Sequence, residues 1–266
     1  MPKVLAVIPA RLASQRLPQK PLQDIAGKSL IRRVWERGSE TRGISRLIIA
    51  TDSLEIRTAA LGFGAEVVMT SGDISTGSER VAAVWRMLQQ ENWDYVINLQ
   101  GDMPFIRSEL IERCLSLYEQ ETQQGNLFDV CTVATPILDQ STFESANDVK
   151  VVVGPLHQAL YFSRAPIPYA RDGLRLQYLN AAGVQTSHFG LKHLGLYVFH
   201  PRVLPLFESA GQSALEQVEK LEQLRLLELG HRIGVCIVPP ELSADSVEVD
   251  TAADLARAIQ IARKQS

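Results

Sequence analysis

The segment KVLAVIPARLASQRLPQKPL, residues 3–22, joins an apolar strand pattern to a loop that carries three cations. The apolar run stops at Pro9, and Arg11, Arg16 and Lys20 follow it closely. Pro9 and two later prolines fix the backbone φ angle, which lowers the entropy lost when the loop becomes ordered. Guanidinium forks and an ammonium suit the oxygens of phosphate groups. The segment therefore predicts a strand that ends at a phosphate-binding loop, and a solvated basic loop is the alternative for its composition alone.

Strand patterns and helical patterns alternate along the first half of the chain. The predicted strands are KVLAVIP (3–9), RLIIATD (46–52), EVVMT (66–70) and YVINLQGD (95–102). The predicted helices are SLIRRVWERGSE (29–40), SLEIRTAALGFG (53–64), SERVAAVWRMLQQE (78–91) and SELIERCLSLYEQE (108–121). This alternation predicts an α/β fold with a mostly parallel sheet and helices on both faces. Ligands of such sheets bind beyond the carboxyl ends of the strands.

The middle of the chain has a different pattern. The runs VCTVATPI (130–137), VKVVVGP (149–155), QALYFSRAPIP (158–168) and LKHLGLYVFHP (191–201) predict antiparallel strands with turns. Residues 170–190 contain Gly, Asn and Ser and predict a mobile loop. We interpret residues 1–266 as one domain with a smaller antiparallel β-rich insertion at about 130–212.

The last part of the chain returns to helix and strand patterns. The run SALEQVEKLEQLRLLELG (213–230) predicts one helix, with a capping box of Ser213 and Glu216 and with Gly230 at its end. Leucines surround Glu216, Glu219 and Gln223, so this helix is expected to be largely buried and its acids need partners. The run RIGVCIVP (232–239) predicts a strand, and VEVDTAADLARAIQIAR (247–263) predicts a short strand, a turn and a helix.

Charge and composition limit the kinds of partner. The net charge is −3, yet residues 1–33 hold seven basic residues and one acidic residue. A local cationic patch on an acidic protein favours a small anionic ligand, so we expect neither nucleic acid nor a membrane as partner. Cys114, Cys131 and Cys236 lie far apart in apolar surroundings and are expected to be buried free thiols. With no signal-peptide pattern at the N-terminus, these features predict a cytoplasmic protein.

Two aspartates follow apolar strand patterns. Asp102 ends the run NLQGD, and Asp250 ends VEVD. Carboxylates at strand ends beside a phosphate loop are suitable ligands for Mg²⁺. Taken singly, Asp102 is equally suited to a turn and Asp250 to a helix cap. If they form a metal pair, they are expected to repel each other without the metal, which would raise the pKa of one of them.

Nine runs together resemble one family over nearly the whole chain. The runs are IPARLASQRLPQKPL, IIATD, TGSERV, NLQGD, VKVV, ALYFSRAPIP, KHLGLY, LEQVEKLEQLRLLELG and VEVDT. They resemble the 3-deoxy-manno-octulosonate cytidylyltransferase (CMP-Kdo synthetase) family. The resemblance implies a nucleotidyltransferase-like, Rossmann-like α/β fold, a homodimer, and Mg²⁺ as cofactor. It also implies transfer of CMP from CTP to Kdo with release of pyrophosphate, for lipopolysaccharide biosynthesis.

The resemblance also implies roles for individual residues. The implied catalytic residues are Arg11, Arg16, Lys20 and Asp102. The implied CTP-binding residues are Arg11, Ser14, Arg16, Lys20, Thr76, Gly77, Ser78, Arg80 and Gln100. The implied sugar-binding residues are Arg164, His193, Tyr197, Glu219, Glu222 and Gln223, with Arg164 and His193 expected to be cations facing the sugar carboxylate. The implied Mg²⁺ ligands are Asp102 and Asp250.

The chain departs from the family pattern at several positions. The family usually reads HQSGTER where this chain has Ile74-Ser75-Thr76-Gly77-Ser78-Glu79-Arg80, and an acid or amide where it has Met103. The closing VDTPED is VDTAAD here. Two alternatives therefore remain open. One is a CMP synthetase for 8-amino-Kdo or for another nonulosonic acid such as a sialic acid. The other is a non-catalytic CTP-binding relative.

Overall fold

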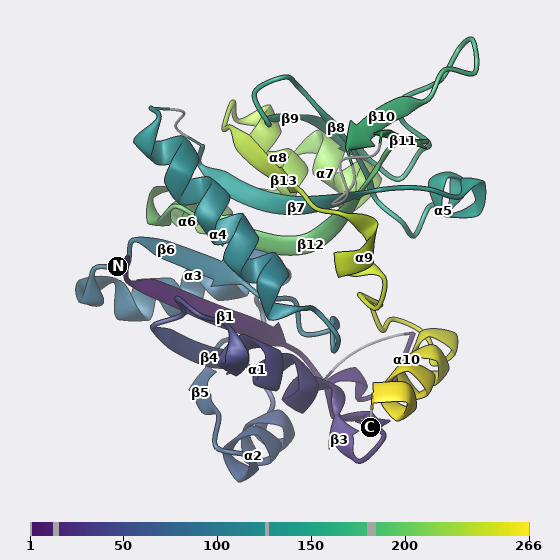
Figure 1. The fold of residues 1–266 in the computed structure, drawn as a ribbon. Coiled ribbons are helices and arrows are strands. Elements are labelled where there is room, and N and C mark those ends of the chain that lie inside the picture. The colour runs from purple at the N-terminus through teal and green to yellow at the C-terminus, as the bar shows by residue number, and fades with distance from the viewer. Residues whose placement is uncertain (1, 13–15, 126–127, 180–184, 266) are drawn as a thin grey trace. The chain divides into compact units, whose positions relative to one another are not determined.

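The computed structural model describes residues 2–12, 16–125, 128–179 and 185–265. Ser14, one of the expected CTP-binding residues, lies outside these ranges. The chain forms two compact units (Figure 1). The first unit comprises Met1–Glu112, Phe199–Ser209 and Asp245–Ser266, and the second comprises Arg113–Val198 and Ala210–Ala244. The description of the chain as one domain with an insertion at about 130–212 stays a prediction.

A four-stranded parallel arrangement forms the centre of the first unit. Its strands, in spatial order, are β6 (Tyr95–Asn98), β1 (Val4–Ala10), β4 (Arg46–Thr51) and β5 (Glu66–Met69). Every residue of β1 except Pro9 is buried. The predicted parallel strands of the first half of the chain are therefore confirmed. Their side chains form the core from which the polar loops at the carboxyl ends emerge.

Helices lie on both faces of these strands. The helices of this unit are α1 (Leu30–Glu40), α2 (Leu54–Gly62), α3 (Gly77–Leu88), α6 (Leu204–Ser209) and α10 (Ala252–Gln265). A Cβ atom on Gly101 would lie 3.7 Å from Ile31 of α1 and from Ile8, whereas one on Gly77 of α3 would lie 3.5 Å from Pro9. Because consecutive strand residues point to opposite faces, α1 and α3 cover opposite faces of β1.

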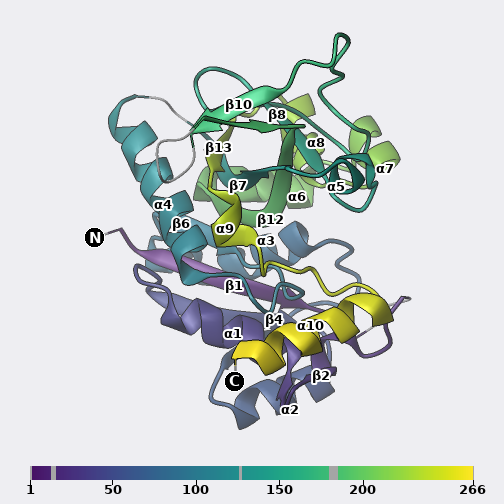
Figure 2. The same ribbon diagram turned by 45° about the vertical axis from the view of Figure 1, so that its right-hand side comes forward.

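The C-terminal helix packs against the N-terminal part of the chain. Figures 1 and 2 show α10 beside the small hairpin of β2 (Asp24–Ile25) and β3 (Lys28–Ser29). Leu17, Ile25 and Ala258 belong to one apolar cluster there. The predicted strand at 247–250 is not formed. In this segment the Val249 N–H donates to the Asp102 carbonyl at 2.9 Å. That bond still brings the two predicted metal ligands to the same place.

The second unit mixes parallel and antiparallel pairing. Its strands are β7 (Val130–Pro136), β8 (Lys150–Val153), β9 (Ala159–Ser163), β10 (Leu176–Leu179), β11 (Gln185–His188), β12 (Leu191–Phe199, whose last residue belongs to the first unit) and β13 (Ile233–Ile237). β8 pairs with β9 and β12 in antiparallel fashion, as predicted. β7 was expected to be antiparallel; its neighbours are β12 and β13, and the prediction is wrong for β13, to which β7 is parallel. A buried strand needs apolar residues whether its neighbour runs parallel or antiparallel to it. The apolar pattern therefore could not indicate the direction of pairing.

Two further expectations for this unit are wrong. Residues 170–190 were expected to form a mobile loop, but β10 and β11 pair there in antiparallel fashion, with the Tyr178 and His188 rings packed edge to face at 5.8 Å. Residues 180–184 of this prediction lie outside the described residues. The single helix over 213–230 is instead α7 (Ala214–Glu219) and α8 (Gln223–Glu228), separated at Lys220, whose φ is 55°. The remaining helices are α4 (Ser108–Gln123), α5 (Gln140–Glu144) and α9 (Pro240–Ser243).

A buried ion pair explains why the helix breaks. Both side-chain oxygens of Glu216 accept hydrogen bonds at 2.7 Å from Arg225, and both side chains are buried. Nine residues of continuous helix would separate these residues by about 13 Å along the axis. The break at Lys220 folds α8 back, so the pair can form. The predicted capping box of Ser213 and Glu216 is confirmed, and the acids of this segment do have partners.

Among the described residues, no helix is long and apolar enough to cross a membrane. Cys114, Cys131 and Cys236 are free and buried, as predicted. Burial raises the pKa of each thiol, which for Cys236 reaches about 11. These cysteines are therefore protonated core residues at neutral pH.

We predict that Gly101→Ala destabilises the protein. The added Cβ would lie 2.7 Å from the Pro9 carbonyl oxygen, a backbone atom that cannot move without shifting β1. We expect a loss of about 1–3 kcal/mol in urea unfolding. Gly62→Ala is the matched control, because Gly62 is exposed at the end of α2 with nothing within 4 Å of an added Cβ. Equal stability of the Gly101→Ala variant and the wild type would contradict the close approach.

Candidate active site

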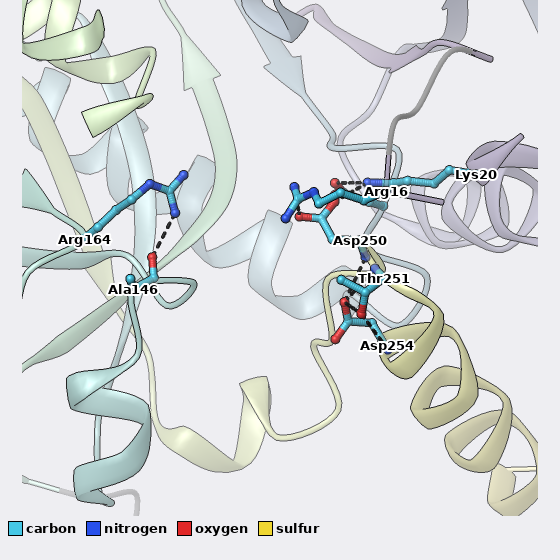
Figure 3. Close-up of polar contacts among 8 residues, drawn as sticks. Arg16, Lys20, Ala146, Arg164, Asp250, Thr251 and Asp254 are labelled. Carbon is cyan, nitrogen blue, oxygen red and sulfur yellow. Dashed lines mark hydrogen bonds and ion pairs between the residues drawn. The ribbon is translucent and has the colours of Figure 1, made fainter. Parts of the chain in front are cut away.

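Lys20 lies between two carboxylates in the first unit, and Figure 3 shows it beside Asp250 and Arg16. Its Nζ donates to Asp102 Oδ2 at 2.8 Å and to Asp250 Oδ1 at 2.7 Å. Arg16 Nη2 donates to the other oxygen of Asp250, also at 2.7 Å. We call these four residues the Lys20 cluster. Three segments far apart in sequence, namely the loop after β1, the turn after β6 and the start of α10, therefore meet as the sequence predicted.

Local structure fixes each member of the Lys20 cluster. Lys20 begins a 3-10 helix, Lys20–Leu22, whose early Pro21 favours the required φ angle. The Asp254 carboxylate accepts hydrogen bonds from the Asp250 N–H, the Thr251 N–H and the Thr251 hydroxyl (Figure 3). Thr251 Oγ1 in turn accepts from the Asp254 N–H. Thr251 and Asp254 thus cap α10, which leaves the Asp250 carboxylate available for Lys20 and Arg16.

The expected rise in the pKa of Asp250 from repulsion by Asp102 is wrong, because the neighbouring cations outweigh it. Burial alone would raise the pKa of Asp250, but hydrogen bonds and charges from Lys20 and Arg16 hold it below its usual range. Burial alone would lower the pKa of Lys20, but the two aspartates raise it. The Lys20 ammonium screens the carboxylates from each other, which is the physical reason that the prediction fails.

The remaining CTP-binding residues expected in this unit lie around the start of α3. Thr76 caps α3 in a capping box with Glu79, and Arg11 Nη2 contacts the Ser75 carbonyl. A Cβ on Gly77 would lie 3.7 Å from Gln100 Oε1. Ser78 is buried in the first turn of α3. The structure therefore brings Arg11, Gln100 and the Thr76–Ser78 turn to one end of the sheet.

Arg80 lies behind this turn and is fully buried. Its Nη1 contacts Thr70 Oγ1, its Nη2 contacts Asp52 Oδ2 at 3.4 Å, and its Nε has no partner among the described residues. Burial lowers the pKa of its guanidinium, and Asp52 opposes this effect. Arg80 joins the ends of β4 and β5 to α3, and its expected role in CTP binding stays a prediction.

The expected sugar-binding residues all belong to the second unit, where they form two groups. In the first, Tyr197 donates to Gln223 Oε1 at 3.0 Å, and the His193 ring lies 5.4 Å from the Tyr197 ring. Gln223 Nε2 is buried and has no partner among the described residues. Phe162 packs edge to face on His193 at 5.0 Å. Phe162 is followed directly by Ser163 of the second group.

The second group is built around Glu219. Its carboxylate accepts from the Ser163 hydroxyl at 2.6 Å and from the Arg164 N–H at 2.9 Å. Its main-chain carbonyl accepts from Arg164 Nε at 2.8 Å, and Arg164 Nη1 donates to the Ala146 carbonyl at 2.9 Å (Figure 3). Glu222 is half-buried directly before α8. Glu219 therefore fixes the main chain and the side chain of Arg164 together.

The sequence of this chain matches a known protein family. The cytidylyltransferase family model matches residues 5–233. The chain belongs to the cytidylyltransferase family. It is 39% identical over 258 residues to the 8-amino-3,8-dideoxy-manno-octulosonate cytidylyltransferase of Shewanella oneidensis, with 97% of each chain covered. It is 39% identical over 259 residues to the 3-deoxy-manno-octulosonate cytidylyltransferase of Syntrophobacter fumaroxidans, with 97% of this chain and 96% of the relative covered.

A solved cytidylyltransferase has the same fold. The structure of CMP:2-keto-3-deoxy-manno-octonic acid synthetase complexed with CTP matches 99% of this chain and 100% of its own length, with a TM-score of 0.84 and 35% sequence identity. The nucleotidyltransferase-like α/β fold predicted from the sequence is therefore confirmed. The strand ends at which this cytidylyltransferase carries the Lys20 cluster are where ligands of such folds bind.

Within the described ranges, no group of three or more His, Cys, Asp or Glu residues could hold a metal ion. Asp102 and Asp250 nevertheless share one cationic neighbour, Lys20 Nζ, so their oxygens converge on one point. Mg²⁺ takes one or two protein carboxylates and completes its coordination with phosphate oxygens and water. The two aspartates fit such a site once a nucleotide supplies further oxygens.

His193 is not the cation that we expected. Its imidazole is buried and contacts Thr132 Oγ1 at 2.8 Å, and burial lowers its pKa to about 3. A neutral imidazole positions its neighbours by hydrogen bonding and packing, so Arg164 is left as the cation among the expected sugar-binding residues. The sequence placed His193 in a strand but could not indicate that both faces of that strand are covered.

Sequence reasoning missed three supporting residues. Asp254 was not recognised, although Thr251 and Asp254 stand three apart before a helical pattern and so match a capping box. Lys150 appeared only as part of VKVV, although a lysine inside an apolar strand signals a buried ammonium that needs acceptors. Ser163 gave no signal of its own.

We predict that Asp250→Asn lowers stability without nucleotide. The change removes one charged partner of Lys20 and the partner of Arg16, and we expect a loss of about 1 kcal/mol, or ~2–4 °C in Tm. Because the folded-state pKa of Asp250 is lowered, its contribution is complete above the unfolded pKa of about 3.9 and is lost as pH falls through the folded value. The difference in Tm between the variant and the wild type should therefore disappear at acidic pH.

The control for this prediction is Asp245→Asn. Asp245 forms an exposed ion pair with Arg107 at 3.6 Å in the same unit, and such a pair contributes little. Thermal unfolding at pH 7 and pH 3 compares the two variants. A rise in Tm at pH 7 for Asp250→Asn would mean that the carboxylates do repel each other.

We also predict that His193 stays neutral from pH 8 to pH 5. Its ring C–H signals in an NMR titration should not shift over this range, because the folded-state pKa is about 3. His193→Gln identifies the signal by its loss. Since unfolded histidine binds a proton below about pH 6.5 and folded His193 does not, the wild type should lose more stability than the variant between pH 6.5 and 4. A midpoint near 6.5 for His193 would contradict its burial.

Proposed function

We propose that this protein transfers CMP from CTP to the anomeric hydroxyl of Kdo and releases pyrophosphate, in lipopolysaccharide biosynthesis. The Lys20 cluster is the observation that carries the proposal. It combines two cations suited to phosphate with two carboxylates suited to Mg²⁺, at the strand ends of a cytidylyltransferase fold. The names of relatives such as that of Syntrophobacter fumaroxidans support Kdo as the acceptor.

The first unit would bind and activate CTP. Arg11, Arg16 and Lys20 would exchange their present acceptors for oxygens of the triphosphate, and Gln100 and the Thr76–Ser78 turn would lie against the cytidine. Asp102 and Asp250 would hold Mg²⁺, which supplies charge neutralisation at the reacting phosphates when bound. With Arg16 and Lys20 placed at the pyrophosphate, the negative charge that develops on the leaving group is stabilised.

The second unit would bind the sugar acid. Arg164 would pair with the sugar carboxylate, because its guanidinium donates only to carbonyl oxygens among the described residues. Tyr197, Gln223, Glu219 and Glu222 would donate to or accept from sugar hydroxyls. The anomeric hydroxyl oxygen attacks the α-phosphorus and its proton is released to water, while the bond from that phosphorus to the bridging oxygen breaks and pyrophosphate leaves with the bond electrons. Orientation of the two substrates carries most of such chemistry.

A specific observation favours one alternative acceptor. Several relatives at 38–39% identity, all from Shewanella, are named 8-amino-3,8-dideoxy-manno-octulosonate cytidylyltransferases. The non-catalytic alternative rested on Met103 and Ile74. Met103 is buried in the core, while its neighbour Asp102 keeps its contact with Lys20. The change at position 103 therefore leaves the Lys20 cluster assembled.

The homodimer and the cytoplasmic location stay proposals. The resemblance implies the dimer, and exposed apolar side chains of the second unit such as Leu156 and Leu160 support a partner surface there. Both proposed substrates, CTP and a sugar acid, are anionic. The local excess of basic residues near the N-terminus accords with the binding of an anion.

The test is pyrophosphate release from CTP and Mg²⁺ with a panel of acids: Kdo, 8-amino-Kdo, N-acetylneuraminic acid and pseudaminic acid. We expect release with Kdo, formation of the CMP-sugar in equal amount, and loss of turnover by at least ~100-fold in Lys20→Met. If the enzyme preferred 8-amino-Kdo, the proposed acceptor would change to 8-amino-Kdo and the proposed reaction would stay the same. Binding of CTP without release for any acid would favour the non-catalytic relative and overturn the proposal.

A further inference from the structure

Lys150 is a fully buried lysine and the first residue of β8. Its Nζ donates to three main-chain carbonyls, those of Ser145 at 2.6 Å, Asp148 at 2.5 Å and Arg164 at 2.7 Å. An ammonium has three donors and no acceptor. All three donors are used, so the charged form is the one that fits this site.

The three carbonyls come from two separate segments. Ser145 and Asp148 belong to the loop between α5 and β8, and Arg164 directly follows β9. Lys150 faces Ser163 in the β8–β9 register, so its side chain reaches past the end of β9. It therefore ties the 145–148 loop to the main chain of Arg164.

The same loop also holds the Arg164 side chain. The carbonyl of Ala146, which lies between two of the residues bound by Lys150, accepts from Arg164 Nη1 at 2.9 Å (Figure 3). The carbonyl of Glu219 accepts from Arg164 Nε at 2.8 Å. These two carbonyls determine the plane of the guanidinium, and one of them depends on a loop that Lys150 anchors.

We propose that Lys150 is a positioning residue for the sugar acid: its ammonium fixes the 145–148 loop and the Arg164 main chain, so that the Arg164 guanidinium is held ready for the sugar carboxylate. The proposal rests on the proposed function, in which Arg164 binds that carboxylate. Lys150 itself touches no substrate, because it is fully buried and its donors are occupied.

A purely structural role would have different consequences. Replacing Lys150 by Met keeps the unbranched stem and removes the ammonium, leaving three carbonyls without their donor. A structural residue would then lower stability and the amount of folded protein without changing the affinity for either substrate. A positioning residue would raise KM for the sugar acid and leave KM for CTP unchanged.

The expected result for Lys150→Met is a rise of about tenfold to a hundredfold in KM for the sugar acid. A binding group misplaced by about 1 Å has an effect of this size. KM for CTP should stay within twofold of the wild type. Lys150→Gln keeps two amide donors and should have an intermediate effect. If Lys150→Met does not fold, Lys150→Gln carries the test alone.

A double-mutant cycle shows whether Lys150 acts through Arg164. Once Arg164 is replaced by Met, the ammonium has no guanidinium to position. The Lys150→Met, Arg164→Met double variant should therefore have the same sugar KM as Arg164→Met within about twofold, since residues that act on one interaction are not additive. Multiplication of the two single effects would mean that Lys150 acts independently, which would overturn the proposal.

Lys192→Met is the matched control. Lys192 faces Lys150 in the β8–β12 register and pairs with the carboxylate of Asp148 at 2.5 Å, but it is part of no proposed binding group. The Lys192→Met substitution removes a cation next to the 145–148 loop and leaves the hydrogen bonds of Lys150 in place. We expect a sugar KM within twofold of the wild type for this variant.

The outcomes separate this inference from the proposed function. If the wild type releases no pyrophosphate with any acid of the panel, the proposed function fails. If the wild type is active and folded Lys150→Met or Lys150→Gln keeps the wild-type sugar KM, the positioning role alone is wrong. An equal rise in the KM values for CTP and the sugar acid would also overturn it, because the effect would then not be confined to Arg164.

Discussion

The contact of Lys20 with Asp102 and Asp250 is the interaction on which the first unit's site depends. It joins a loop near the N-terminus to a strand end in the middle of the chain and to the start of the last helix. Each of the three charges is partly buried, and none would be stable there alone. Arg16 and the cap formed by Asp254 complete the arrangement. The carboxylates of Asp102 and Asp250 therefore have a cationic partner, Lys20, before any ligand binds.

The second unit relies on buried cations of a different kind. Arg225 is neutralised by the carboxylate of Glu216, while Lys150 is surrounded by carbonyl dipoles. A pair of full charges mainly fixes one packing arrangement, here the break between α7 and α8. A cation among carbonyls fixes main-chain segments and keeps its positive field. That difference suits Lys150 to a region proposed to bind an anionic sugar.

Much of the first unit could be predicted from its sequence because its pattern has few solutions. Buried strands that alternate with amphipathic helices specify a parallel sheet, and this places Pro9, Asp102 and the polar loops at one edge. The second unit could not be predicted as well. The direction of β7 and the break at Lys220 depend on contacts between residues distant in sequence, such as Glu216 with Arg225.

The protonation states of the candidate residues were the least predictable feature. A histidine in a strand and two aspartates at strand ends look the same in sequence whether they are exposed or enclosed. Enclosure lowers the pKa of His193 to about 3, and the position of Lys20 lowers that of Asp250. Each shift depends on a neighbour from another segment, so only the assembled chain determines it.

The cations of the first unit and Arg164 of the second unit differ in what they must give up when a ligand binds. Lys20 and Arg16 already hold aspartates, so a phosphate must replace one ion pair with another. That exchange is close to balanced for partly exposed pairs, and on the proposed function it would become favourable if Mg²⁺ took the released carboxylates. Arg164 holds only carbonyls among the described residues and gains a full ion pair on binding a carboxylate. On the proposed function, nucleotide affinity therefore depends on the metal, whereas affinity for the sugar acid depends on how firmly the carbonyls around Arg164 are held.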